Sequence, residues 1–446
     1  MAAQGWRPPG LWRVCPVGQH TMLDIAFIRD YPDLVKAGAR KKRIQVDIDR
    51  LLDVDRQRRS LITEIEQLRA ERNRKSKLVS SLPPGEREAI LAETRGLTEQ
   101  LRRSETALAP LEAEFERLML QVPNVPAADV PDGLTDADNV EIRRWGELPT
   151  FTFTPRDHVE IGETLDLIDV KRAVRIAGTR TYFLKNEAVL LELAVLRFTL
   201  DHMVRRGFTP MLVPHLVKDE AMVGTAYFPG GEEQAYRVEK DAVNLIGTAE
   251  VPLTAYHYDE ILHESELPKR YVGISACYRR EAGTYGRDTR GLYRIHQFHK
   301  VEQVIICTAD EQVSIAEHED IVRYAEEVLQ ALQLPYRLVN VCGGDLGVPQ
   351  VKKYDIETWM PSRNGYGETH SASRFYDFQA RRLKLRYRDR QGRVHYAHTL
   401  NNTVIASPRI LIPILEIYQQ EDGSVIVPEA LRPYMGGIER IESKKK

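Results

Sequence analysis

The chain has 446 residues, of which 42% are hydrophobic and 29% charged, so it is long enough for two or more domains with buried cores. Its formal net charge of −2 excludes a bulk attraction to polyanions, and any contact with a nucleic acid would need a local basic surface. Its four cysteines lie far apart and no apolar run approaches the roughly 18 residues that span a bilayer, so we expect a cytoplasmic protein without a structural zinc site, a disulfide framework or a membrane segment.

Residues 1–21 differ from everything that follows. They hold Trp6 and Trp12 among arginines and prolines, but no continuous apolar core of the kind that a secretory signal has. Met22 then opens a fresh pattern, Met22-Leu-Asp-Ile-Ala-Phe-Ile-Arg-Asp-Tyr. We interpret residues 1–21 as a disordered N-terminal extension. The lack of acidic residues leaves a short transit peptide open as the alternative.

Between about Ile44 and Val122 the composition shifts to Leu, Glu, Arg, Gln and Ala, which favour helix. Apolar residues recur at three- and four-residue spacings at Ile90, Leu97, Leu101, Leu108, Leu111, Phe115, Leu118 and Val122, and more loosely at Leu51, Val54, Leu61, Ile65 and Leu68. Such spacings indicate two helices that pack through a heptad seam. Between them, Pro83, Pro84 and Gly85 turn the chain back. The pattern predicts an antiparallel coiled-coil hairpin whose second helix, roughly 55 to 60 Å long, projects into solvent.

Basic residues gather near the far end of this hairpin. They are Arg69, Arg72, Arg74, Lys75 and Lys77 on the first helix and Arg102 and Arg103 on the second. A basic stripe of this kind could meet RNA phosphates, so we take these residues as candidate RNA contacts. Glu64, Glu66 and Glu99 lie nearby, however. A solvated mixed-charge face, and a hairpin that serves only for dimerisation or as a spacer, therefore stay open.

The segment from Gln121 to Gly133 is punctuated by prolines, which is typical of a linker. Beyond it aromatic residues return, and alternating strand patterns mix with short helices. We predict an α+β chain in three parts: the extension 1–21, a helical arm 22–130 and a second domain 131–446.

Three ordered stretches of the second domain carry most of the chemical information. The run from Phe208 to Pro214 alone predicts a buried strand. The stretch from Tyr271 to Glu302 predicts two strands joined by a loop of about ten residues rich in Gly and Arg, for which a charged surface hairpin is the plain alternative. The stretch from Thr399 to Leu411 predicts a strand that passes into a helix, with Pro408 near its first turn.

With these stretches the chain resembles the class II seryl-tRNA synthetases of the bacterial type. The second signature motif of that family contains Arg-x-Glu and a closing Phe-x-Lys-Val-Glu, which correspond here to Arg279, Glu281 and the run from Phe298 to Glu302. The resemblance runs from residue 22 to about residue 437 and includes the helical arm. It implies a catalytic domain built on an antiparallel β-sheet flanked by helices, and an ATP-dependent enzyme that joins L-serine to serine tRNA through an adenylate.

The resemblance assigns the ATP site to residues of the second and third motifs. Activation places the serine carboxylate in line with the α-phosphorus of ATP, so the site needs cations around the phosphates and no covalent nucleophile. Arg279 is expected to bind the α-phosphate, and Arg409 to lie over the adenine and at the γ-phosphate; these two are the candidate catalytic residues. The other ATP residues by resemblance are Glu281, which accepts from the adenine amino group, Phe298, which stacks on the ring, and Glu368, Thr369, His370 and Ser371.

Magnesium is implied by the charge of the leaving pyrophosphate, with Glu368 and Ser371 as its ligands by resemblance. A histidine at position 370 suggests a general base, but the reaction needs none. We favour a packing or hydrogen-bonding role for His370. The resemblance assigns serine binding to Thr248, Ala249, Glu250, Arg279, Glu302 and Thr403. Taken alone, the run from Gly247 to Glu250 would be an ordinary helix-capping sequence.

The resemblance also implies partners. The first motif of the family builds a dimer interface around its proline, so the match of Phe208 to Pro214 implies a homodimer. The arm implies recognition of serine tRNA through shape and backbone, and of a selenocysteine tRNA where one is present.

Several positions depart from the family pattern. Thr403 stands where many members have serine, and other frequent residues are replaced by Asn402, Val404, Ser407, Pro408, Ala372 and Arg374. Pro413 is expected to kink the helix after the third motif, because a proline inside a helix removes a backbone hydrogen bond.

Two other functions stay open. A synthetase-like ligase could pass its amino acid to a carrier protein, although such an acceptor would not require the long arm. A degenerate copy could act as a scaffold, but it would be expected to have lost some of the charged motif residues. Those are Arg279, Glu281, Glu302, Glu368 and Arg409, and all are present.

Overall fold

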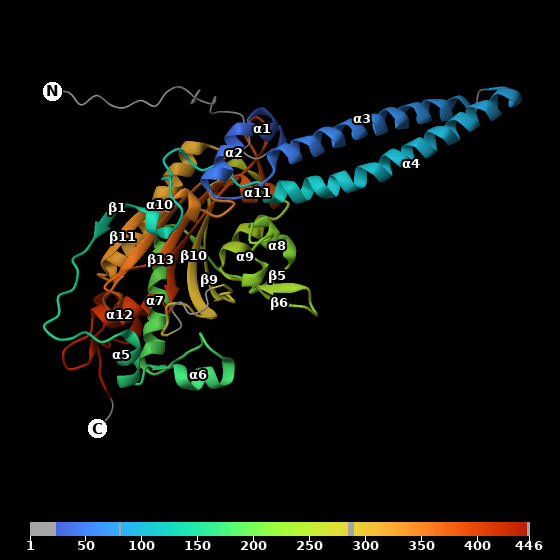
Figure 1. The fold of residues 1–446 in the computed structure, drawn as a ribbon. Helices are drawn as coiled ribbons and strands as arrows, with labels where there is room; N and C mark the ends of the chain where they lie inside the picture. Colours follow the sequence, from blue (N-terminus) through green and yellow to red (C-terminus); the bar gives the residue numbers. More distant parts are fainter. Residues whose placement is uncertain (1–23, 80–81, 284–289, 444–446) are drawn as a thin grey trace, which may run out of the picture.

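The computed structural model describes residues 24–79, 82–283 and 290–443. A long helical arm projects from a larger α+β body, and two short helices, α1 (Ile25–Asp30) and α2 (Pro32–Lys41), lie where the two meet (Figure 1). The predicted fold class, a helical arm followed by an α+β domain, is confirmed. The predicted extension 1–21 lies outside the described residues.

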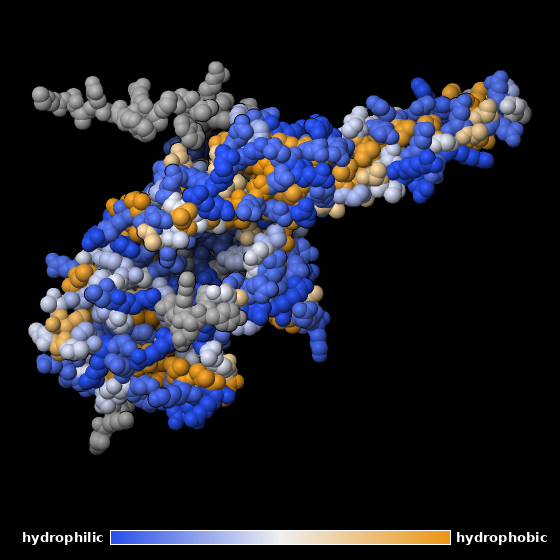
Figure 2. Space-filling model, viewed as in Figure 1, coloured by the Kyte–Doolittle hydropathy of each residue, from blue (hydrophilic) through white to orange (hydrophobic). Residues whose placement is uncertain are grey.

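The arm consists of two antiparallel helices, α3 (Ile48–Leu78) and α4 (Pro84–Gln121). They pack through the predicted seam, whose buried members include Leu51, Val54, Ile65, Leu101 and Leu118. With 38 residues, α4 is about 57 Å long, and Pro110 lies inside it without ending it. Figure 2 shows that the outer surface of the arm is mostly hydrophilic, with hydrophobic residues gathered between its helices and at its root.

The root of the arm is fastened to the body by buried polar contacts. Lys42, directly after α2, is 2% exposed and donates to three carbonyl oxygens of the segment 347–350, at 3.0, 3.0 and 2.5 Å. Burial lowers the pKa of Lys42, and the carbonyls replace part of the hydration that its ammonium group loses. Asn124, just after α4, donates to the carbonyl of Pro349 at 3.0 Å. Residues from both ends of the arm therefore hold this one segment.

An eight-stranded sheet forms the body, in the order β1-β11-β12-β13-β16-β10-β9-β4. Neighbouring strands are antiparallel, except for β4 and β9, which are parallel. The strands are β1 (Val140–Trp145), β4 (Thr209–Leu212), β9 (Lys269–Tyr278), β10 (Gln297–Cys307), β11 (Tyr336–Asn340), β12 (Lys352–Met360), β13 (Gly365–Tyr376) and β16 (His398–Ser407). The predicted antiparallel sheet is thus confirmed.

Two long helices, α7 (Glu187–Arg205) and α10 (Glu311–Ala331), cover one face of the sheet. Alternation along β10 turns Val301, Gln303 and Ile305 toward these helices, where Gln303 donates to the carbonyl of Ile321 on α10, and turns Lys300 and Glu302 to the opposite face. Shorter elements surround the sheet. They are α5 (His158–Thr164), α6 (Val170–Ala177), α8 (Asp219–Gly224), α9 (Glu250–Thr254), α11 (Phe378–Arg382), α12 (Leu411–Ile417), β2 (Ile168–Asp169), β3 (Phe183–Leu184), β5 (Leu216–Val217), β6 (Tyr236–Val238), β7 (Val243–Leu245), β8 (Ile261–His263), β14 (Arg386–Arg388), β15 (Val394–Tyr396), β17 (Val425–Ile426) and β18 (Arg440–Ile441).

Two predictions about strands were wrong. The run from Phe208 to Pro214 forms β4, which is not buried: it lies at an edge of the sheet, and Leu212 is 86% exposed. An apolar sequence indicates a strand but cannot tell a buried strand from an exposed one at the edge of a sheet. The connection between β9 and β10 is also longer than ten residues, because the chain leaves the ladder at Arg279 and returns only at Gln297. Residues 284–289 within it lie outside the described ones.

The predicted kink at Pro413 rested on a wrong helix boundary. Helix α12 begins at Leu411, which makes Pro413 its third residue. The N–H groups of the first helical turn have no partner within the helix, so a proline there removes no helical hydrogen bond. Pro413 is thus compatible with α12 as it stands.

Candidate active site

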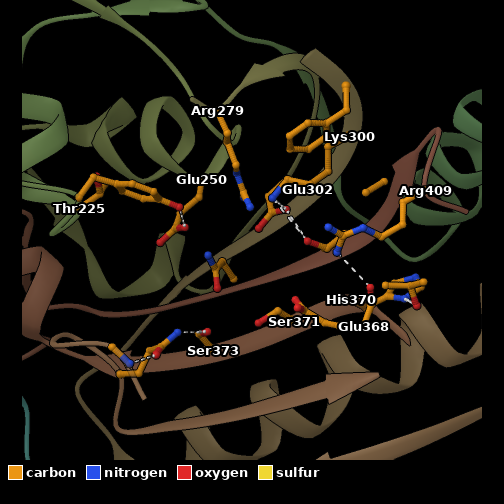
Figure 3. A pocket seen from close by; sticks show the side chains of 18 of the residues that line it. Thr225, Glu250, Arg279, Lys300, Glu302, Glu368, His370, Ser371, Ser373 and Arg409 are labelled. Atoms are coloured by element: carbon orange, nitrogen blue, oxygen red, sulfur yellow. Dashed lines mark hydrogen bonds and ion pairs between the residues drawn. The ribbon is translucent and has the colours of Figure 1, made fainter. Parts of the chain in front are cut away.

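A cavity of about 290 Å³ opens on the face of the sheet opposite α7 and α10. Figure 3 shows the charged side chains that converge there, Glu250, Arg279, Lys300, Glu302, Glu368 and Arg409. Of the residues that the sequence assigns to ATP and serine, all line this cavity except Thr248 and Ala249. Segments more than a hundred residues apart therefore meet at one site.

Three cavity residues come from alternate positions of β10: Phe298, Lys300 and Glu302. The pairing of β10 with β16 shifts between Val301 and Glu302, which sets Glu302 directly opposite Thr403. Lys300 Nζ lies 2.6 Å from Glu302 Oε2, and Thr403 Oγ1 donates to the same oxygen at 3.3 Å. Glu302 is 1% exposed; burial raises its pKa, and Lys300 opposes that shift.

A second buried acid, Glu250, begins α9 and faces the same cavity. The hydroxyl of Tyr227 donates to Glu250 Oε2 at 3.0 Å, and the side-chain amide of Gln379 donates to Oε1 at 2.8 Å. Burial, together with the negative charge of Glu302, raises the pKa of Glu250 to about 7. The site thus holds two buried acids, one of which carries a lysine partner.

Thr248 and Ala249 lie behind the cavity wall. They are 1% and 0% exposed, and Thr248 Oγ1 accepts from the backbone N–H of Glu250 at 3.2 Å. Gly273 on β9 permits this close packing, because a Cβ there would lie 2.9 Å from Leu253 and 3.1 Å from Ala249. The two residues position Glu250 and do not themselves line the cavity.

Arg279 enters the cavity at the end of β9. Its Nε donates to the carbonyl of Gly247 at 3.2 Å, and its guanidinium carbon lies 5.3 Å from the centre of the Phe298 ring. Glu281 has a φ of +53° and its carboxylate accepts from Arg294 at 2.7 Å. A positive φ at a non-glycine residue is strained and recurs at ligand sites.

A bulge places Glu368 and Ser371 on the same side of β13. Residues three apart would face opposite sides of a regular strand, but the pairing with β12 skips Thr369. The hydroxyl of Thr369 lies 2.7 Å from that of Thr358, inside the sheet. His370 is 1% exposed, with Nδ1 2.8 Å from Thr369 Oγ1 and Nε2 3.0 Å from the carbonyl oxygen of Val404.

Protein partners thus occupy both ring nitrogens of His370, and burial lowers its pKa to about 4. These contacts suit the packing and hydrogen-bonding role and leave neither nitrogen directed at a ligand. Within the described residues, no group of three or more His, Cys, Asp and Glu side chains could hold a metal ion. The carboxylate of Glu368 and the hydroxyl of Ser371 are therefore candidate oxygen ligands only in company with a ligand's own oxygens.

Arg409 enters the cavity between β16 and α12. Its Nε donates to the carbonyl of Tyr293 at 3.0 Å, its Nη1 donates to that of Glu368 at 3.0 Å, and its guanidinium carbon lies 4.4 Å from the centre of the Tyr293 ring. Enclosure by the cavity walls would raise the pKa of Glu368, but the positive charges of Arg409 and of Lys353 behind it prevail and lower it. Anionic Glu368 and cationic Arg409 thus stand side by side.

The basic residues of the arm lie far from this cavity, and most are engaged by arm acids. Arg69 pairs with Glu105 at 2.6 Å, and Lys75 pairs with Glu93 at 2.6 Å. Arg102 and Arg103 both contact Glu99, at 2.9 and 3.2 Å. Arg72 donates to the side chain of Asn73 at 3.0 Å, and Arg74 and Lys77 are exposed. These ion pairs are those expected of a solvated mixed-charge face.

The cavity residues that the sequence prediction missed include Tyr227, Tyr293 and Lys300. It also missed Gln379, which does not line the cavity but donates to Glu250. Lys300 lies within the quoted second motif, and its place two residues before Glu302 on one strand was the available signal. Of the positions that depart from the family pattern, Asn402, Val404, Ala372 and Arg374 are buried outside the cavity lining, whereas Thr403 and Ser407 line it.

Across the described residues, no helix is both long and apolar enough to cross a membrane.

Comparisons with known families and proteins follow the two parts of the fold. Residues 22–126 match the seryl-tRNA synthetase N-terminal domain, and residues 236–418 match the class II core domain of tRNA synthetases for G, H, P, S and T. A serine–tRNA ligase of Deinococcus radiodurans is 49% identical over 94% of this chain and 98% of the relative. One of Dictyoglomus thermophilum is 44% identical over 95% of this chain and 100% of the relative.

Solved structures give the same result. The seryl-tRNA synthetase of Pyrococcus horikoshii, crystallised with ATP, superposes with a TM-score of 0.87 at 39% identity over 95% of this chain and 100% of that one. A cytoplasmic serine–tRNA ligase of Naegleria fowleri, in complex with AMP, superposes with a TM-score of 0.85 at 30% identity over 96% of this chain and 100% of that one.

Proposed function

Because this chain belongs to the seryl-tRNA synthetase family, we propose that it activates L-serine with ATP as an adenylate and transfers the seryl group to the 3′ end of serine tRNA. The observation that carries this function is a single cavity that holds two phosphate-binding candidates, Arg279 and Arg409, beside two buried acids, Glu250 and Glu302. A carrier-protein acceptor and a degenerate scaffold are disfavoured, since the full arm and the charged residues of the site are both present.

In this reaction Arg279 binds the α-phosphate and the serine carboxylate, because its planar fork can donate to both groups during in-line attack. Phe298, which already contacts Arg279, stacks against adenine, and Glu281 accepts from the adenine amino group. Arg409 lies over the adenine and binds the γ-phosphate. These groups stabilise charge that develops on the phosphates, and the reaction requires no base from the protein.

The serine ammonium group lies between Glu250 and Glu302, where two buried carboxylates offer opposite charge. Thr403 contacts Glu302 and faces the hydroxyl end of the substrate. A site that pairs a hydroxyl rejects alanine strongly, because alanine would leave buried polar groups unpaired. Thr248 and Ala249 support this site through Glu250.

Magnesium fits the site on chemical grounds. Glu368 and Ser371 present hard oxygen atoms on one side of β13, and Mg²⁺ binds through few protein oxygens together with phosphates and water. When bound, the ion would neutralise charge on the leaving pyrophosphate. Thr369 and His370 act through the local geometry of the strand.

The partners follow from the outer parts of the fold. The arm, 22–130, binds serine tRNA through exposed basic side chains such as Arg74, and a selenocysteine tRNA is a further substrate where one is present. The exposed edge strand β4 of the catalytic domain, 131–446, supports a homodimer, because Leu212 and Leu193 on nearby α7 expose apolar side chains that a second copy would cover. A cytoplasmic location completes the proposal.

The test is amino-acid-dependent exchange of pyrophosphate into ATP, measured with each of the twenty amino acids. Exchange with serine alone is expected, and Arg279→Ala should reduce it by about 10³-fold because a donor to the transition state is lost. Exchange with another amino acid would overturn the assigned substrate. No exchange with any amino acid would favour a non-catalytic scaffold.

A further inference from the structure

A buried carboxylate outside the cavity, Glu416 on α12, collects four hydrogen-bond donors. It accepts from the backbone N–H and ring Nδ1 of His158, at 3.0 and 2.8 Å, and from the backbone N–H and hydroxyl of Ser362, at 2.9 and 2.8 Å. Its side chain is 0% exposed. Because an ionised carboxylate can only accept, all four contacts are well matched. Helix α5, which begins at His158, lies beside α12 in Figure 1.

His158 extends this contact to the long connection between β9 and β10. The backbone N–H of Leu292 donates to His158 Nε2 at 3.2 Å. Nε2 is therefore unprotonated, and Nδ1 carries the proton that is donated to Glu416. Gly291, with a φ of +85°, permits this approach, because a Cβ there would lie 2.2 Å from Nε2. The ring thus fixes the backbone at Leu292.

Tyr293, the next residue, lies between two cationic side chains. The guanidinium carbon of Arg409 lies 4.4 Å from the centre of the Tyr293 ring, and that of Arg363 lies 4.1 Å from it. Arg363 directly follows Ser362 in the short helical turn Pro361–Arg363. One route runs from Glu416 through His158 to Leu292, the residue before Tyr293, and the other runs through Ser362 to the adjacent Arg363, whose guanidinium lies over the Tyr293 ring.

We propose that Glu416, acting through His158 and Ser362, is a positioning residue that holds Tyr293 and thereby Arg409 in the geometry that binds ATP. The inference rests on the proposed role of Arg409 in ATP binding. It assigns a function to a carboxylate that does not line the cavity and that would otherwise only join α12 to α5. It also agrees with the hydrogen bond from Arg409 Nε to the carbonyl of Tyr293. Through this bond the position of the Arg409 side chain depends on the path of the backbone at Tyr293.

Glu416→Gln tests this inference because it preserves size and shape. The amide nitrogen of glutamine would face a donor wherever it pointed, so at least one of the four contacts becomes unfavourable. In the serine-dependent exchange assay, the KM for ATP should rise about tenfold while the KM for serine stays within about twofold. Glu421→Gln is the matched control: the same chemical change five residues away, at an exposed side chain, should leave both constants unchanged.

The split between the two constants separates positioning from stability. A protein that is only less stable contains less active enzyme, which lowers the apparent kcat and moves neither KM. A folded Glu416→Gln with an unchanged KM for ATP would overturn the inference, as would an equal rise in both constants. Failure of the proposed function gives a different result, since the unchanged protein would then show no serine-dependent exchange.

If Glu416→Gln does not fold, Ser362→Ala tests the positioning role of Glu416 in its place. Ser362 is exposed, and the substitution removes one of the four donors without burying a new polar group. The KM for ATP should rise about two- to threefold, again with little change for serine. A KM for ATP equal to that of the unchanged protein would overturn the inference.

Discussion

The arm and the cavity place charged side chains in opposite surroundings. Along the arm, Arg102 and Arg103 meet Glu99 at the surface, where water and salt screen the interaction. In the cavity, Lys300 and Glu302 are 5% and 1% exposed and in contact at 2.6 Å. We therefore expect such ion pairs to be replaceable on the arm and indispensable in the cavity, because burial removes the water that would otherwise solvate an unpaired charge.

The largest effect should come from breaking the buried pair. Glu302→Gln leaves the Lys300 ammonium buried without its anion and removes one carboxylate that serine requires, so kcat/KM for serine in the exchange assay should fall about 10³-fold. The exposed Glu421→Gln serves as the control here too. A loss of less than about tenfold would show that the cavity tolerates unpaired charge as the arm does.

Removing the outer arm should separate the two regions. Arg69 on α3 pairs with Glu105 on α4, and Leu101 lies one turn before Glu105. A short linker from Arg69 to Leu101, in place of residues 70–100, would therefore join the two helices where they already face one another. The KM for serine tRNA should rise about 100-fold, since phosphate contacts are lost, while exchange stays within about twofold. Aminoacylation kinetics with unchanged tRNA charging would contradict the assigned role of the arm.

The pH dependence of serine binding should sharpen the contrast. The pKa of Glu250 is raised to about 7, so its carboxyl group becomes protonated as the pH falls and attracts the serine ammonium less. The KM for serine should therefore rise as pH falls below about 7, by at most about tenfold per unit. Glu250→Gln should give a high KM that no longer shows this dependence. A wild-type KM that is flat across this range would contradict the prediction.

The smallest effect should come from the arm surface. Arg102 and Arg103 lower the pKa of Glu99 to about 2, yet all three side chains are exposed. Glu99→Gln should change the Tm by less than about 2 °C in a thermal melt, because exposed ion pairs contribute little. A larger loss would mean that the arm depends on its surface charges for folding.

The sequence predicted the arm well because a heptad seam is local: Leu101 and Leu118 lie on one helix, and their spacing alone places them on one face. Most charged residues of the cavity could be picked out by motif, although Lys300 was missed. Their geometry could not, because it depends on bulges at Thr369 and beside Glu302 that no alternation pattern announces.

Residues that belong to no motif were out of reach. Gln379 and Tyr227 contact Glu250 from parts of the chain more than twenty residues away, and only the tertiary fold brings them together. The same holds for Glu416, whose partner His158 lies at the far end of the catalytic domain's sequence. Pro413 was misjudged because its effect depends on where α12 begins.

The three carbonyl oxygens that bind Lys42 determine where an arm from one such protein can be joined to the catalytic domain of another. A graft cut within the proline-rich segment 121–133 would carry Lys42 and Asn124 onto a host whose 347–350 segment follows another path, and a buried ammonium group would then lack its acceptors. A cut partway along α3 and α4 exchanges only the outer turns. The outer part of the arm can therefore be exchanged between proteins, whereas the root of the arm has to stay with the catalytic domain that it contacts.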